Sequence, residues 1–362
     1  MKVVLAPDKF AGTLSADQAA RAMRRGWSRV RPDDEVVIVP MADGGEGTLA
    51  VVESGVPGAE RVEADVADAR GRAGAAAWLR LPDGRALVEA AAACGLSRLG
   101  PGERDPLLTT SYGVGQLLRA AVEGGATAII IGLGGSATVD GGGGMLTALG
   151  HRLLREDGNG VKVGGRWLGD TARIVRGPDI GVPVTVASDV TNPLLGPDGA
   201  AAVFGPQKGA DAERIRLLEA GLGAFADAVE RDLEGGPWRD LPGAGAAGGL
   251  GFALLAFCNA KLVPGADAVA DLVGLEPALR GAAVAITGEG SLDAQSAAGK
   301  APNYVLGRAR NFGVRVLAIA GRVHDGAGAA FDAVADLGPE GLERAAALVE
   351  ERAADLAAKV EA

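Results

Sequence analysis

The segment with the most chemically useful side chains is TGEGSLDAQSAAGK, which runs from Thr287 to Lys300. It follows an apolar, strand-like run and combines glycines, hydroxyls, acids and one lysine. Backbone N–H groups exposed by glycine can bind phosphate oxygens, hydroxyls add further donors, and the lysine supplies a compact positive charge. The composition predicts an anion site, and we interpret it as half of a site for phosphoryl transfer.

Lysine is used sparingly, since seven of the 36 basic residues are lysine and the others are arginine. Lys9, Lys208 and Lys300 all lie in loops that contain glycine or proline, beside acids or hydroxyls. A lysine is a point charge and suits a phosphate or carboxylate oxygen better than the planar fork of arginine does. These three lysines are therefore candidate anion ligands. The alternative is that they are solvated surface side chains.

Acidic side chains gather in the same kind of loop. Phosphoryl transfer needs carboxylates to hold Mg²⁺ and one more to accept the proton of the acceptor hydroxyl. We expect Asp189 to be that base or a ligand of the substrate hydroxyl, and Asp293 and Glu289 to lie near the metal. Asp8 and Asp43 are explained equally well as caps of their own loops. The remaining acids of these loops are Glu46 and Asp140.

The elements that position these side chains follow from hydrophobic periodicity. Short apolar runs alternate with segments of helical period, which predicts parallel sheets with crossover helices. The expected strands are Lys2–Leu5, Glu35–Val39, Thr127–Ile131, Val182–Ala187, Ala282–Ile286 and Arg315–Ala320. Helices are expected from Ser15, whose spacing to Gln18 forms a capping box, near Thr110, Asp211 and Gly248, and from Pro339 to Val360.

Each unusual loop begins where a predicted strand ends. The loops are APDKFAGT, PMADGGEGT (40–48), GLGGSATVDGGGG (132–144), SDVTNP (188–193) and TGEGS. In open α/β sheets, ligands bind beyond the carboxyl ends of the strands. We therefore expect these loops to line one cleft, with two domains facing each other across it.

The length of 362 residues exceeds the roughly 250–300 residues at which a single core stops growing, so two domains are expected. Both chain ends consist of βα units, whereas residues 61–93 change to alternating strands joined by a turn at Pro82–Gly84. We predict a discontinuous parallel-sheet α/β domain of residues 1–65 plus 285–362. Residues 66–284 are expected to form an inserted α/β domain with a mixed sheet.

Charge and composition exclude several classes of function. A net charge of −10 without clustered Lys and Arg argues against nucleic acid and anionic membrane surfaces as partners. The chain shows neither a signal peptide nor an apolar stretch long enough to span a bilayer, so we expect a cytoplasmic protein. Cys94 and Cys258 are far apart and in apolar surroundings, which indicates small buried side chains rather than a disulfide or zinc site.

Two well-known nucleotide-binding motifs, the dinucleotide pattern and the P-loop, give little evidence of nucleotide binding in this chain. GLGGSA (132–137) satisfies the dinucleotide pattern, but GAGAAG (243–248) does so too, and chance matches are expected in a chain with 58 glycines. No GxxxxGK[ST] occurs, which excludes an ordinary P-loop. The two histidines, His151 and His324, are isolated from acids and cysteines in the sequence, so no catalytic role is expected for either.

The ordered set of motifs resembles the bacterial two-domain glycerate kinases, which phosphorylate glycerate with ATP. The resemblance covers nearly the whole chain and rests on APDKFAGTLSADQAA, PMADGGEGT, GLGGSATVDGG, SDVTNPLLGPDGAAAVFGPQKGA, GAGAAGGLGFALL and TGEGSLDAQSAAGKAP. It implies a flavodoxin-like domain made of both chain ends and a separate inserted α/β domain. Ala11 departs from the family, which often has a second basic residue there. Lys9 is its expected replacement.

The resemblance further implies transfer of the γ-phosphoryl group of ATP, with Mg²⁺ as cofactor, to a hydroxyl of D-glycerate. The product 2-phosphoglycerate is favoured over 3-phosphoglycerate by family analogy alone. The expected catalytic residues are Asp189, Lys300 and Asp293, with Asp293 and Glu289 at the metal. The expected substrate ligands are Asp8, Lys9, Asp43, Glu46 and, for the carboxylate, Arg72. The expected phosphate and nucleotide ligands are Gly134, Gly135, Ser136, Lys208, Gly288, Gly290, Ser291 and Ser296.

Two other functions stay open at this point. A nicotinamide-dependent hydroxyacid dehydrogenase would reduce NAD in the presence of glycerate. A non-catalytic sensor of small organic acids would bind glycerate without consuming ATP. The expected partners are small-molecule substrates, D-glycerate and ATP. A homo-oligomer is compatible with the sequence, which contains no signal that fixes the oligomeric state.

Overall fold

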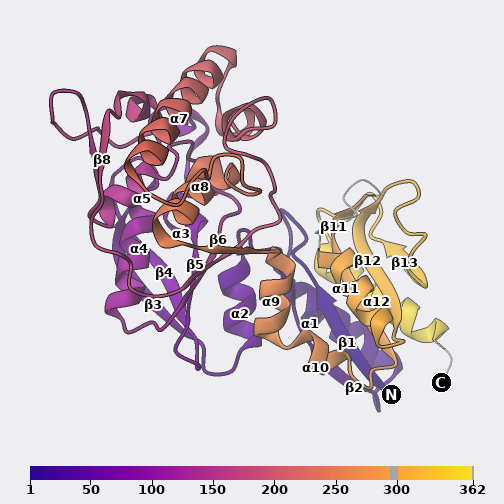
Figure 1. Cartoon of the computed structure of the whole chain (residues 1–362). Helices are drawn as coiled ribbons and strands as arrows, with labels where there is room; N and C mark the ends of the chain where they lie inside the picture. Colours follow the sequence, from indigo (N-terminus) through magenta and orange to yellow (C-terminus); the bar gives the residue numbers. More distant parts are fainter. Residues whose placement is uncertain (294–300, 361–362) are drawn as a thin grey trace. The chain divides into compact units, whose positions relative to one another are not determined.

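The computed structural model describes residues 1–293 and 301–360, and the chain forms two compact units (Figure 1). The terminal unit consists of Met1–Asp43, Ala50–Pro57 and Pro264–Ala362, and the inserted unit of Gly44–Leu49 and Gly58–Val263. Each unit contains its own β-sheet and its own hydrophobic core. Helices and strands alternate in both, which confirms the predicted α/β fold class.

The terminal unit is built on a five-stranded parallel sheet with the order β13-β12-β11-β1-β2. Counted along the chain within this unit, the order reads 2-1-3-4-5, which is the flavodoxin-like order. The order reverses between β1 and β11, and strands from both chain ends therefore share one sheet, as predicted. The strands are β1 (Lys2–Pro7), β2 (Glu35–Ile38), β11 (Val284–Leu292), β12 (Arg315–Val323) and β13 (Ala333–Asp336).

Helices α1 (Ala16–Val30) and α12 (Ala345–Lys359) pack against each other and share one buried core with the sheet. The capping box of Ser15 and Gln18 is present at the start of α1, as predicted. The two helices approach closely because Gly26 has no side chain, and a Cβ there would collide with the backbone of Glu350. The other helices are α9 (Gly265–Val273), α10 (Leu275–Leu279), α11 (Ala301–Asn311) and α2 (Thr48–Gly55), which begins in the inserted unit.

Strand β11 continues beyond the predicted end at Ile286. Its pairing with β12 extends to Leu292, which lies opposite Val323. A side chain at Gly288 would collide with the backbone of β12, so glycine is what permits the two strands to pair here. The expected anion-binding loop therefore starts on a strand, which corrects the loop assignment of Gly288, Gly290 and Ser291.

The inserted unit is built on a six-stranded mixed sheet with the order β10-β9-β6-β5-β4-β3. Strands β5, β6, β9 and β10 are parallel, and β3, β4 and β5 are antiparallel neighbours. The predicted turn at Pro82–Gly84 joins β4 to β5, and the amide of Leu81 bonds the carbonyl of Arg85 across it at 2.8 Å. The strands are β3 (Glu60–Ala67), β4 (Ala73–Arg80), β5 (Ala86–Glu89), β6 (Ile129–Gly132), β9 (Val184–Ala187) and β10 (Lys261–Val263).

The register aligns the carboxyl ends of the four parallel strands. Glu89 lies opposite Gly132, Gly132 opposite Ala187, and Ala187 opposite Val263. A separate hairpin consists of β7 (Arg152–Leu154) and β8 (Arg173–Val175). The α-helices of the inserted unit are α3 (Ala90–Cys94), α4 (Tyr112–Glu123), α5 (Gly143–Ala148), α6 (Ala200–Phe204), α7 (Ala212–Asp232) and α8 (Ala246–Cys258).

The two units divide the chain at other residues than the sequence suggested. Residues 58–65 belong to the inserted unit because β3 pairs with β4 along its whole length. Residues 264–284 belong to the terminal unit, where Arg308 of α11 forms ion pairs with Asp267 of α9 and Glu276 of α10. Within the described residues, none of the helices has both the length and the apolar character needed to cross a membrane.

Candidate active site

The loop after β6 carries three of the predicted phosphate ligands, Gly134, Gly135 and Ser136. Two backbone hydrogen bonds fix it against the segment after α3, from Leu96 N–H to the Gly135 carbonyl at 2.8 Å and from Ala137 N–H to the Cys94 carbonyl at 2.7 Å. An isolated bridge between Gly95 and Ser136 completes this contact. The loop is therefore held in a defined conformation at the carboxyl edge of the sheet, where ligands of parallel sheets bind.

Lys208 reaches the same loop from the short 3-10 helix Pro206–Lys208. Its side chain is almost completely buried, with 3% of the residue exposed. The ammonium donates hydrogen bonds to Ser136 Oγ at 3.1 Å and to the Thr138 carbonyl at 2.8 Å. A lysine has three donors, so this group can also bond an anion. The structure thus brings Lys208 and Ser136, two of the predicted phosphate ligands, into direct contact.

Burial determines the charge properties of this lysine. The loss of solvation lowers the pKa of Lys208 from its usual 10.5 to about 8, and the negative charge of Asp140 acts in the opposite direction. A cation whose charge is poorly solvated gains more from an anionic ligand than a surface lysine does. Lys208 is therefore suited to bind a negatively charged group.

A cavity of about 300 Å³ adjoins Lys208 and the β6 loop. Its wall includes the loop glycines Gly134 and Gly135, and it combines two hydroxyls, one amide and the ammonium of Lys208 with five apolar side chains. Glycines at these positions also leave backbone N–H groups accessible to a ligand. The cavity is lined by Leu96, Leu133, Gly134, Gly135, Ser136, Ser188, Val190, Phe204, Gln207, Lys208 and Ala247.

Asp189, the predicted base, lies in the loop after β9. It is exposed, and it stands between Ser188 and Val190, which both line the cavity. Strand β9 is the parallel neighbour of β6, so the register of the sheet places the β6 and β9 loops at the same edge. The structure thus brings Asp189 to the same part of the inserted unit as Ser136 and Lys208.

Glu46 joins this group through the short segment Gly44–Leu49, which belongs to the inserted unit. Its carboxylate accepts a hydrogen bond from Ser97 Oγ at 2.7 Å. The segment lies close against the β6 loop, because a Cβ on Gly134 would come within 2.5 Å of Gly45. The backbone of Leu49 is bound in turn by the carboxylate of Glu89, the last residue of β5, at 2.6 Å.

Asp140 has a clear structural role that the sequence did not assign. Its buried carboxylate accepts hydrogen bonds from the amide and hydroxyl of Ser111 at 2.8 and 2.9 Å. The amides of Gly142 and Gly144 donate to it at 3.2 and 3.3 Å. Burial raises the pKa of Asp140, while these donors oppose the rise. The only signal for this role in the sequence is an acid directly followed by four glycines, TVDGGGG.

The helix α8 supports the β6 loop from another side. Three successive residues inside it, Ala247, Gly248 and Gly249, have φ values of 52°, 70° and 91°. The amide of Gly141 donates to the Gly248 carbonyl at 3.0 Å. A side chain on Gly248 would overlap the Thr138 carbonyl, the same oxygen that Lys208 binds. The motif GAGAAGG therefore permits close backbone packing at the site and is no dinucleotide fingerprint.

In the terminal unit, several of the expected substrate and metal ligands lie on or after β1 and β11, the two strands at which the sheet order reverses. The amide of Asp8 bonds the Gly288 carbonyl at 2.8 Å, and the carboxylate of Asp8 accepts from the amide of Lys9 at 2.6 Å. This second bond is the loop-capping role that we considered as the alternative for Asp8. Asp43 follows β2 at the end of the first segment of this unit.

Further predicted residues lie along β11. Glu289, Gly290 and Ser291 are part of the strand, and Asp293 follows it directly. The Ser291 hydroxyl lies 3.1 Å from His324 Nε2, so a histidine without an expected role contacts a predicted phosphate ligand. Lys300 and Ser296 lie outside the described residues.

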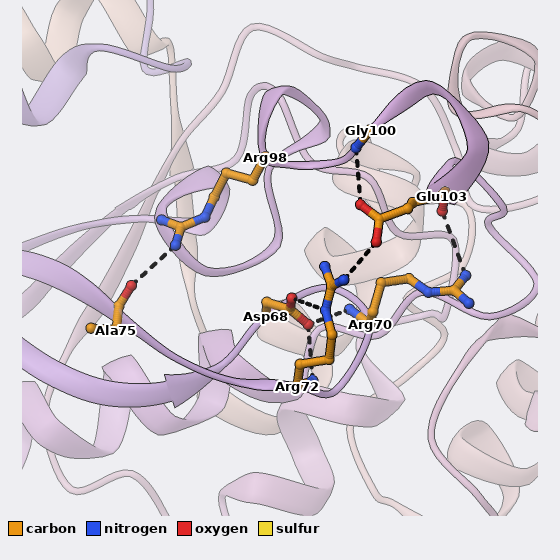
Figure 2. A network of polar contacts seen from close by, with 7 residues as sticks. All are labelled: Asp68, Arg70, Arg72, Ala75, Arg98, Gly100 and Glu103. Atoms are coloured by element: carbon orange, nitrogen blue, oxygen red, sulfur yellow. Dashed lines mark hydrogen bonds and ion pairs between the residues drawn. The ribbon is translucent and has the colours of Figure 1, made fainter.

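Arg72, expected to bind the substrate carboxylate, forms ion pairs within the inserted unit (Figure 2). Its Nε bonds Asp68 at 2.6 Å, and its NH1 bonds Glu103 at 2.5 Å. Figure 2 also shows Arg70 donating to the Glu103 carbonyl and Glu103 accepting from the Gly100 amide. Arg72 does not line the cavity beside Lys208. A bidentate bond from Arg72 to a substrate would have to displace one of these acids.

The described carboxylates suit Mg²⁺ only if a substrate supplies further oxygen ligands. No group of three or more His, Cys, Asp or Glu side chains that could hold a metal occurs in the described part of the chain. Mg²⁺ usually retains waters and is bound by one or two carboxylates plus substrate phosphates. The carboxylates of Glu289 on β11 and Asp293 directly after it provide that chemistry, so the residues fit an ion that arrives with a nucleotide.

The fold and these sites define an α/β protein with a buried lysine and a small cavity at the carboxyl ends of its parallel strands. The model of the glycerate kinase family matches residues 3–361. The chain therefore belongs to the glycerate kinase family, as the motifs had indicated.

Individual relatives agree with this assignment. The chain is 42% identical to the glycerate kinase of Bacillus subtilis, with 99% of this chain and 98% of that protein covered. It is 44% identical to the glycerate 2-kinase of Escherichia coli, with 91% and 87% covered. A crystal structure from Salmonella typhimurium, assigned as glycerate kinase 2, superposes with a TM-score of 0.88 at 42% identity, covering 99% of this chain and 97% of that one.

Proposed function

We propose that this protein transfers the γ-phosphoryl group of ATP to the C2 hydroxyl of D-glycerate, giving 2-phosphoglycerate and ADP. The observation that carries the proposal is the buried ammonium of Lys208 beside a small cavity that also exposes the hydroxyls of Ser136 and Ser188, in a chain of the glycerate kinase family. The name of the E. coli relative supports the C2 position. The assignment of ATP rests on the resemblance of the motifs.

The size of the cavity supports a small ligand in the inserted unit. Its volume of about 300 Å³ is at the lower end of the roughly 300–1,000 Å³ typical of small-molecule sites. A three-carbon acid with a phosphoryl group suits this space better than a whole nucleotide does. Lys208 and Ser136, with the amides of Gly134 and Gly135, bind the oxygens of the phosphoryl group in this proposal.

The proposed chemistry is an in-line displacement at the γ-phosphorus. The glycerate hydroxyl oxygen forms the new P–O bond, its proton passes to the carboxylate of Asp189, and the bond to the β-phosphate oxygen breaks to release ADP. Glu46, Asp8 and Lys9 are proposed to bind glycerate, and Lys300 to bind phosphate oxygens. Mg²⁺ would neutralise charge on the phosphates, with Glu289 and Asp293 as its protein ligands.

Phosphorus NMR of the reaction mixture tests this proposal. We expect a phosphomonoester signal of 2-phosphoglycerate that appears only when ATP, Mg²⁺ and D-glycerate are all present. A signal of 3-phosphoglycerate would reject the C2 assignment and retain the kinase. Absence of ADP formation would reject the kinase. NADH formation at 340 nm in a parallel assay with NAD would instead identify a dehydrogenase.

A further inference from the structure

The terminal unit contains a second and larger cavity, with a volume of about 720 Å³. It lies at the carboxyl ends of β11, β12 and β13 and is bounded on another side by the loop after β1, which contributes Phe10. A site in this position is typical of flavodoxin-like sheets. The volume falls well inside the roughly 300–1,000 Å³ of small-molecule sites and exceeds that of the cavity beside Lys208.

Apolar side chains supply much of the wall of this cavity. Phe10 and Leu337 are buried, whereas Leu342 is 79% exposed. Leu342 is the most exposed of the large hydrophobic residues in the described part of the chain, and the next, Leu217, is 55% exposed. A leucine left in water at the wall of an open cavity indicates a surface that a flat, apolar group covers.

Charged groups at the ends of two neighbouring strands complete the wall. Asp336 ends β13 and lies opposite Ala320 of β12, and Arg322 follows two residues further along β12. Gly338, with a φ of 71°, turns the chain two residues after Asp336. An ionised carboxylate accepts hydrogen bonds only and can bind two vicinal hydroxyls, while a guanidinium binds phosphate. The cavity thus combines one apolar surface, one hydroxyl acceptor and one cation.

We propose that this cavity binds the adenosine part of the nucleotide, with the base against Leu342 and Leu337, the ribose hydroxyls on Asp336, and Arg322 toward the phosphates. The assignment rests on the proposed kinase function, which supplies the nucleotide. It adds the nucleoside subsite and its residues.

Equilibrium binding of ADP to the full-length protein, measured by isothermal titration calorimetry, tests the subsite without turnover. Asp336→Asn and Leu342→Ala should each weaken ADP binding about tenfold or more, since a charged hydrogen bond or the apolar contact of the base is lost. Both side chains are exposed, so we expect unchanged thermal unfolding. The matched controls are Glu343→Gln and Leu217→Ala, exposed residues that line neither cavity, and they should bind ADP like the parent.

Comparison of ADP with 2′-deoxy-ADP tests whether Asp336 binds the ribose 2′-hydroxyl. The parent protein should prefer ADP to 2′-deoxy-ADP, and Asp336→Asn should lose that preference, as a double-mutant cycle between protein and ligand requires. The KM for ATP should rise in both variants while the KM for glycerate stays constant.

The outcomes separate this subsite from the proposed function. If the parent forms phosphoglycerate but both variants bind ADP within twofold of the parent, the subsite is wrong and the kinase stands. If ADP binding depends on Asp336 and Leu342 but no phosphoglycerate forms, the subsite stands and the kinase is wrong. If the parent binds neither ADP nor ATP, both proposals are overturned.

Discussion

At the scale of single residues, Lys208 is the group whose environment departs most from that of a surface lysine. Its methylene chain and its ammonium are both buried, and its hydrogen bonds to Ser136 Oγ and the Thr138 carbonyl fix the position of its charge. A fixed, poorly solvated cation requires no reorganisation when negative charge develops nearby.

Replacement of Lys208 by methionine should lower kcat about 10²- to 10³-fold, because one preorganised donor to the transferred phosphoryl group is lost. Methionine fills a similar volume but leaves the Ser136 hydroxyl and the Thr138 carbonyl without this donor, so we expect a loss of stability of about 1–3 kcal/mol. Lys208→Arg should not restore activity, because the planar guanidinium does not fit the same place. Steady-state kinetics with circular dichroism melts measure both effects. A kcat within threefold of the parent would remove Lys208 from the mechanism.

The pH dependence of this lysine has opposite signs for activity and stability. Activity needs the protonated form, so kcat/KM should fall as the pH rises through about 8. Between about 8 and 10.5 the unfolded chain holds more protons on this group than the native protein does, so its contribution to the free energy of unfolding increases with pH. The pH–rate profile of the parent shows the effect on activity. Denaturation of the parent and of Lys208→Met at several pH values isolates the contribution of this lysine to the free energy of unfolding. A kcat/KM that stays constant to pH 10 would contradict the assignment.

At the scale of elements, close backbone packing determines where the site residues lie. The β6 loop is fixed by the segment after α3, by Gly44–Leu49 and by the first turn of α8, and several of these contacts are possible only without a side chain. Gly248 is the clearest example, because it has a φ of 70° and touches the carbonyl that Lys208 binds. An element far along the sequence therefore affects the position of the β6 loop.

Gly248→Ala tests this packing. The new Cβ would overlap the Thr138 carbonyl, and its positive φ is unfavourable for alanine, so we expect a loss of about 1–3 kcal/mol in stability and at least a tenfold decrease in kcat. The matched control is Gly307→Ala in the interior of α11, where no atom lies within 4 Å of the new Cβ. That change should stabilise the protein by about 0.5–1 kcal/mol. Denaturant unfolding and kinetics distinguish the two, and equal behaviour would contradict the packing account.

The sequence predicted these elements well where local signals are strong. The capping box of Ser15 specified the start of α1, and each of the six predicted strands is present and starts within about two residues of its predicted position. The register of the parallel strands then explains why Ser136 and Asp189 lie at one sheet edge. The last helix begins at Ala345 rather than at Pro339, since residues 339–344 form turns.

Other features could not be predicted because they depend on contacts between distant residues. The ion pair of Arg72 with Glu103 joins residues 31 positions apart, and nothing near Arg72 indicates it. The continuation of β11 depends on pairing with β12, which overrides the turn preference of its glycines. The short strand β13, AVAD, has no distinctive pattern, and the cavity bounded by Asp336 was therefore missed.

At the scale of the whole molecule, the two units differ in how the chain builds them. Apart from Gly44–Leu49, the inserted unit is one continuous stretch, Gly58–Val263, whereas the sheet of the terminal unit needs both chain ends. β1 pairs with β2 on one side and with β11 on the other. A chain without its last hundred residues would retain only two of the five strands in this sheet.

A truncated protein ending at Val263 should therefore fold only in part. We expect the amides of residues 58–263 to stay protected in hydrogen exchange, because the sheet and core of the inserted unit are complete. The amides of β1 and α1 should exchange freely, since two strands alone are too few for an independent sheet. The full-length chain serves as the control. Protection of residues 2–7 in the truncated protein would contradict this account.

The place of β11 between its neighbours also affects biosynthesis. β1 ends at Pro7 and its partner β11 begins only at Val284, so β1 leaves the ribosome well before β11 is synthesised. At roughly 5–20 residues per second, the nascent chain waits on the order of 15–60 s before this pairing is possible. During that interval the apolar run VVLA has one free edge, and a trigger-factor-like or Hsp70-like holdase would have its main opportunity to bind there.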